Sequence, residues 1–133
     1  MRTVIAVAWA GVLAAILILS FAQIPSERLP ESVRWGFGLG HVPAYGVLAA
    51  LTLRLLMLFR RSMRYRSAVL ATVVATMAVG GLVELLQPAV GRTSDWADIA
   101  MNAFGMTVAL VCMAVVRGRR AMRRSVSQLP ASE

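Results

Sequence analysis

The sequence predicts an all-α protein, an integral membrane bundle of four transmembrane helices. The chain has 133 residues, of which 59% are hydrophobic, and a mean hydropathy of +0.72. A soluble domain is about half apolar, and here the apolar residues come in long runs. Each run is close to the roughly 20 residues that a helix needs to cross hydrocarbon. The few polar residues inside these runs fall at corresponding ends of three of them. The expected solvent is therefore a bilayer.

The four apolar segments leave room for short loops and for no second domain. We expect one transmembrane domain over 1–116, with helices at about 3–22, 36–59, 67–90 and 97–116. The stretch 117–133 is basic and then contains Ser, Gln and Pro, which predicts a frayed helix end and a disordered tail.

The first segment has a second interpretation. Arg2 precedes an apolar stretch that ends at Ser20, Phe21 and Ala22, which is similar to a signal-peptidase site. The apolar run is longer than the usual core of a signal peptide. A spanning helix is therefore the favoured reading.

The charge distribution predicts the orientation of the spans. The net charge of +8 comes from 14 arginines and no lysine. A soluble protein with this balance would suggest nucleic acid, but these arginines lie between apolar runs, so we expect no nucleic-acid partner. They gather at the N-terminus, in the second loop and in the tail, whereas the first loop (Glu27, Arg28, Glu31, Arg34) and the third loop are balanced. With four spans, the positive-inside rule places both termini in the cytoplasm.

The polar residues inside the spans lie at the predicted outer end. His41 is in the first turns of the second segment, and Glu84 and Gln87 are in the last turns of the third. Asp98 and Asn102 are in the first turns of the fourth segment. At 1.5 Å per residue all of them lie within about 10 Å of the outer interface.

Helical spacing predicts that these side chains face the bundle interior. Small or polar residues recur every four positions in three segments, a spacing that lets helices approach closely. The three stripes are Thr72, Thr76, Gly80, Glu84; Asp98, Asn102, Gly105, Ala109; and His41, Tyr45, Ala49, Thr52. We therefore expect a polar pocket that opens outward.

Several roles are open for the acids and the histidine. An acid within a span is a functional candidate by default, so Glu84 is either a base, proton carrier or cation ligand, or a structural hydrogen-bonding group. His41 has the same two readings. Asp98 either caps the fourth helix or takes part in binding or acid–base work. We expect the partner of Glu84 to be His41 or Arg92, since both lie at its end of the bundle.

The remaining polar residues have structural alternatives too. Asn102 is expected to join helices by hydrogen bonds. Arg92 pairs with Asp95 or Glu84, or binds an anionic headgroup. Arg54, near the inner end of its segment, is expected to extend toward the interface. The single cysteine, Cys112, forms no internal disulfide, and one histidine with a few acids predicts no metal site and no cofactor.

Four sequence blocks resemble the VanZ-like family of small bacterial membrane proteins. They are Gly40-His41-Val42-Pro43-Ala44-Tyr45-Gly46-Val47-Leu48, Val83-Glu84-Leu85-Leu86-Gln87, Gly91-Arg92-Thr93-Ser94-Asp95-Trp96-Ala97-Asp98 and Asn102-Ala103-Phe104-Gly105. Their order and spacing match over roughly 36–116. Many members carry an Asp-Lys pair shortly before the histidine, where this chain has Gly38, Leu39 and Gly40.

The resemblance implies a bacterial inner-membrane protein of the cell envelope, and the family is named for a member linked to teicoplanin resistance. It assigns His41, Glu84, Gln87, Arg92, Asp98 and Asn102 to the family's polar positions, and Asp95 lies in the same block as Arg92 and Asp98. We expect a ligand site formed by these residues and Tyr45, which binds a lipid-linked cell-wall precursor or a glycopeptide. Membrane lipids are the expected partners, and the oligomeric state is left open. The alternatives are an enzyme with catalytic candidates Glu84, His41 and Asp98, and a non-catalytic scaffold subunit.

Overall fold

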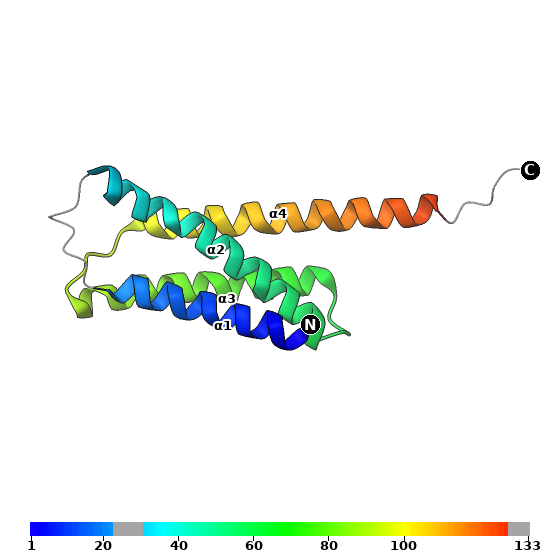
Figure 1. The fold of residues 1–133 in the computed structure, drawn as a ribbon, viewed down its shortest axis with the longest axis horizontal. Coiled ribbons are helices and arrows are strands. Elements are labelled where there is room, and N and C mark those ends of the chain that lie inside the picture. Colours follow the sequence, from blue (N-terminus) through cyan, green and yellow to red (C-terminus); the bar gives the residue numbers. More distant parts are fainter. Residues whose placement is uncertain (23–30, 128–133) are drawn as a thin grey trace, which may run out of the picture.

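The protein, described from a computed structural model, is an all-α bundle of four long helices (Figure 1). The structure describes residues 1–22 and 31–127, and only the backbone of 31–38 and 126. The helices are α1 (Arg2–Phe21), α2 (Glu31–Phe59), α3 (Tyr65–Leu86) and α4 (Trp96–Val126), and a 3₁₀ turn, η2 (Gln87–Val90), extends α3. The predicted charges at Glu27 and Arg28, and the last six residues, lie outside the described part.

All four helices are long and apolar enough to cross a membrane. The apolar spans are Arg2–Phe21, Leu39–Phe59, Tyr65–Val90 and Trp96–Ser125. Many large hydrophobic side chains lie on the surface of the bundle, as expected where lipid replaces water. The predicted fold class, a membrane bundle of four helices, is confirmed.

Two helix bounds differ from the prediction. α2 begins at Glu31 rather than near 36, because a helix extends beyond its apolar part when polar residues continue the backbone ladder. α4 runs to Val126, so the segment 117–126 is helical and the prediction of a disordered tail from 117 is wrong for it. Basic residues are favourable near a helix C-terminus, and Arg123 and Arg124 lie in the last turn. Figure 1 shows α4 extending well past the other helices.

The helices α2 and α4 approach each other closely where they cross. A Cβ atom at Gly105 would overlap the carbonyl oxygen of Val42, and one at Gly46 would lie 3.1 Å from the carbonyl oxygen of Gly105. Only glycine allows the two backbones to meet in this way. The crossing brings the first turns of α2 against the first turns of α4.

The predicted inward stripe of α3 is confirmed by burial. Thr72, Thr76, Gly80 and Glu84 are all buried, while Leu70, Val74 and Leu82, on other faces of the helix, are exposed. The hydroxyl of Thr72 donates a hydrogen bond of 2.8 Å to the carbonyl oxygen of Ala68, so this polar group is satisfied within its own helix.

α1 is the least buried helix. Ile16 is its one fully buried residue among those described, and it packs with Tyr45 and Leu48 of α2. Trp9 Nε1 donates a hydrogen bond of 2.9 Å to Thr52 Oγ1, which fixes α1 against the middle of α2. α1 therefore reads as a peripheral span rather than part of the central contact.

Candidate functional site

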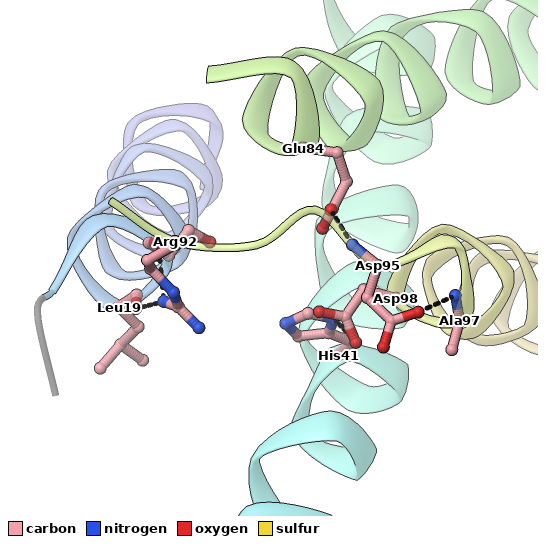
Figure 2. Close-up of polar contacts among 8 residues, drawn as sticks. Leu19, His41, Glu84, Arg92, Asp95, Ala97 and Asp98 are labelled. Carbon is pink, nitrogen blue, oxygen red and sulfur yellow. Dashed lines mark hydrogen bonds and ion pairs between the residues drawn. The ribbon is translucent and has the colours of Figure 1, made fainter. Parts of the chain in front are cut away.

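The polar residues predicted to form a site lie at one end of the bundle, which we call the polar end. It comprises the C-terminal turns of α1 and α3, the first turns of the α2 and α4 spans, and the connection Gly91–Asp95 (Figure 2). His41 is the third residue of its apolar span, and Asp98 is the third of its own. Because His41 and Asp98 lie at similar depths in their helices, their positions in the sequence were enough to predict that they fall at the same end of the bundle.

Glu84 holds the connection between α3 and α4. Its side chain is 4% exposed, and its Oε2 accepts a hydrogen bond of 3.0 Å from the backbone N–H of Asp95. Its carbonyl oxygen accepts a bond of 2.8 Å from the hydroxyl of Ser94. The expected partner, His41 or Arg92, is not the one that the structure shows.

The connection is shaped by η2 and a glycine. Gly91 adopts φ 77°, the left-handed conformation that favours glycine, and its N–H donates to the carbonyl of Pro88. The N–H of Arg92 donates to the carbonyl of Gln87, which is itself buried. This reversal carries the chain back across the end of α3 toward Glu84.

Asp95 is the N-cap of α4. Its Oδ1 accepts a hydrogen bond of 2.8 Å from the N–H of Ala97, which satisfies one of the free amides of the first turn. The alternative that Asp98 caps α4 is therefore wrong, although Asp98 does lie in the first turn, where an acid interacts favourably with the helix dipole. Asp95 is followed three positions later by a second acid, Asp98, which is a variant of the capping-box spacing. This spacing is the sequence signal that indicates Asp95 as the N-cap.

Arg92 fixes the end of α1. Its Nη1 donates bonds of 2.8 Å to the carbonyl of Ser20 and 3.2 Å to the carbonyl of Leu19. The last carbonyls of a helix have no partner within the helix, and a cation is favourable there. The predicted partners of Arg92 are acids or a headgroup; these carbonyls are not among them, because backbone groups carry no sequence signal.

His41 faces Asp98. Its Nδ1 lies 3.4 Å from Asp98 Oδ1, which makes an ion pair when the ring is protonated, although the orientation is not that of a hydrogen bond. The side chains are 26% and 23% exposed, so both remain accessible. Tyr45 lies edge-on to the ring, with centroids 6.3 Å apart. Figure 2 shows the pair beside the Glu84–Asp95 contact.

Asn102 is buried deeper in the bundle. A Cβ atom at Gly80 would lie 3.0 Å from its Nδ2 and 3.2 Å from Cε1 of Tyr45. Asn102 and Tyr45 therefore pack against α3 one helical turn below Glu84. The amide oxygen of Asn102 has no hydrogen-bond partner within the described residues.

The polar end thus divides into two groups. Glu84, Asp95 and Arg92 are engaged in holding the connection and α1, whereas His41 and Asp98 contact each other and stay accessible. Across the described residues, no three His, Cys, Asp or Glu side chains are grouped to hold a metal ion. The arrangement offers a donor and an acceptor side by side.

No family model, curated protein or solved structure matches the chain. The fold and the polar end define a small helical membrane bundle with a charged cluster at one end.

Proposed function

We propose that the chain is a bacterial inner-membrane protein of the VanZ-like kind, whose polar end faces outward and binds the headgroup of a lipid-linked or cell-envelope ligand. The carrying observation is the His41–Asp98 pair, which joins α2 to α4 and whose side chains are still about a quarter exposed. An imidazole beside a carboxylate suits the hydroxyl and amide groups of a sugar or peptide headgroup. The arginine-rich loop and tail support this orientation.

Arg92 supports a ligand that also carries phosphate. Both of its bonds use Nη1, so its other guanidinium N–H groups have no partner among the residues that the structure describes. Arginine binds phosphate through two parallel hydrogen bonds from the N–H groups of its planar guanidinium. A headgroup that reaches from His41 to Arg92 would place its sugar or peptide part on the pair and its phosphate on the guanidinium.

The test is mass spectrometry of lipids that co-purify with the protein. We expect Asp98→Asn and His41→Gln to lose a lipid-linked species that the wild type retains. Asp95→Asn is the matched control, because it removes the same charge at the same end and asparagine is an equally good N-cap. Equal loss in Asp95→Asn, or retention in Asp98→Asn, would contradict the proposal.

A membrane enzyme is the second candidate, and the same pair favours it. A histidine oriented by a carboxylate is a common general acid–base arrangement. Here the acid beside His41 is Asp98, while the carboxylate of Glu84 is bonded to the Asp95 amide. An enzyme predicts that His41→Gln retains and accumulates the lipid-linked species, whereas a binding site predicts its loss.

A scaffold subunit is the third candidate. It is favoured by Glu84, Asp95 and Arg92, whose contacts join three helices. In this case Asp98→Asn leaves both lipids and phenotype unchanged. The family resemblance adds glycopeptide tolerance as the phenotype to measure, as growth of a deletion strain and its complemented form in teicoplanin.

A further inference from the structure

The basic end of the bundle, opposite the polar end, contains a cavity of about 650 Å³. It lies between the start of α1, the last turns of α2, the start of α3 and the overhanging part of α4. Its apolar lining includes Ile5, Leu53, Met57, Met113 and Val116. Four arginines also line it, Arg54, Arg117, Arg120 and Arg124.

Among the residues that the structure describes, no acid lies beside these arginines. Glu84, Asp95 and Asp98 are the acids within 39–127, and all three belong to the polar end. The one ion pair found in the described part of the chain joins His41 and Asp98. Four guanidinium groups around one cavity repel one another, so an anion there would be strongly favoured.

Arg54 is the most informative of the four. It lies five residues before Phe59, inside the apolar span of α2, so its backbone is about 7.5 Å deeper than the end of that span. An arginine within a span carries a large cost unless it reaches water, an acid or an anion. Its place in the cavity lining gives it a route to an anion.

Tyr65 supplies an independent observation. Its side chain lines the same cavity, and its hydroxyl is buried with no hydrogen-bond partner among the described residues. The guanidinium carbon of Arg117 lies 4.6 Å from the ring centroid, a cation–π contact that orders this arginine at the rim. A buried hydroxyl without a partner is uncommon, and a bound headgroup would supply one.

We propose that this cavity is a binding site for an anionic phospholipid. The phosphate lies among the four arginines and the hydroxyl of Tyr65, and the acyl chains run along the apolar lining. The combination of cations and apolar walls fits a lipid better than a free anion. Phosphatidylglycerol is the simplest probe, because it differs from phosphatidylcholine in headgroup charge.

The experiment compares lipid retention by the full-length protein in native mass spectrometry, in detergent with added phosphatidylglycerol or phosphatidylcholine. We expect the wild type to retain phosphatidylglycerol selectively. Arg117→Gln with Arg120→Gln lowers this retention by about fivefold for each arginine removed. Arg119→Gln with Arg123→Gln is the matched control on the same helix, because neither residue lines the cavity.

Two further variants keep the result decisive. Arg54→Gln removes the deepest cation, and Tyr65→Phe removes only the hydroxyl. Each change, made alone in the wild-type protein, is expected to weaken the retention of phosphatidylglycerol. Equal loss in both α4 double variants would overturn the proposal in favour of general surface attraction. Thermal stabilisation by inorganic phosphate equal to that by phosphatidylglycerol would overturn the assignment to a lipid.

Discussion

Individual charged residues at the polar end have distinct roles despite their proximity. Glu84 accepts from the Asp95 amide, Asp95 caps α4, and Asp98 faces His41. Only the last contact joins two accessible side chains that carry opposite charges when the imidazole is protonated. The three acids should therefore respond differently to the same loss of charge.

Glu84→Gln is expected to fold and to lose about 1 kcal/mol of stability, because the glutamine oxygen still accepts from the Asp95 amide but without the charge. Glu84→Ala is expected to lose about 1–3 kcal/mol, since the amide then has no partner. Unfolding in detergent, followed by circular dichroism, measures both. Equal loss in the two variants would show that this hydrogen bond has no structural role.

Arg92→Gln is expected to loosen the end of α1, because the carbonyls of Leu19 and Ser20 lose their donor. A hydrogen bond of about 1 kcal/mol corresponds to roughly fivefold faster opening. Hydrogen exchange at the amide of Ala22, which bonds to the carbonyl of Ile18, reports this opening. Arg60→Gln, an exposed arginine at the basic end, is the control and should leave this amide unchanged.

At the scale of elements, the site depends on how closely α2 and α4 cross. The crossing at Gly105 and Val42 lies next to His41 in α2 and about two helical turns after Asp98 in α4. A wider crossing would separate these side chains even though neither is altered. The glycines of this crossing are thus positioning residues for the site.

Gly105→Ala tests this dependence. Its Cβ atom meets the Val42 carbonyl, so the helices must move apart at a cost of about 1–3 kcal/mol. Gly81→Ala is the control, because nothing lies within 4 Å of its Cβ position and alanine favours a helix by about 1 kcal/mol. We expect Gly105→Ala to lower stability and lipid-linked ligand retention, and Gly81→Ala to lower neither. Retention that survives in Gly105→Ala would separate the site from the crossing.

For the whole molecule, the four spans place the connection Gly91–Asp95 and the α2–α3 turn at opposite ends. In Figure 1 the N-terminus lies near the α2–α3 turn, which contains the arginine-rich loop. By the positive-inside rule we expect this end to lie in the cytoplasm and the polar end to face outward.

Single-cysteine labelling in a Cys112→Ala background measures this topology. We expect a membrane-impermeant thiol reagent to label Thr93→Cys in intact spheroplasts and to label Ser62→Cys only after the membrane is opened. Thr93 is preferable to Ser94, whose hydroxyl bonds to Glu84. The reverse pattern would invert the topology and exclude an outward-facing ligand site.

The sequence by itself determined the four spans, the inward stripe of α3 and the common depth of the polar residues. These properties follow from hydropathy and from the 3.6-residue period, which are local along the chain. Thr72, Thr76, Gly80 and Glu84 are buried because their spacing keeps them on one face. The helical extension to Val126 was missed because charged residues form helices as readily as apolar ones.

Only the tertiary structure decided which polar groups meet. Glu84 pairs with a backbone amide because the turn at Gly91 directs the connection across α3, and Arg92 reaches carbonyls of α1 that lie more than 70 residues away in sequence. Asp98, not Glu84, faces His41 because the glycine crossing sets the rotation and distance of α2 and α4. Pairing depends on helix rotation and loop path, which arise from packing between segments rather than from the pattern within any one of them.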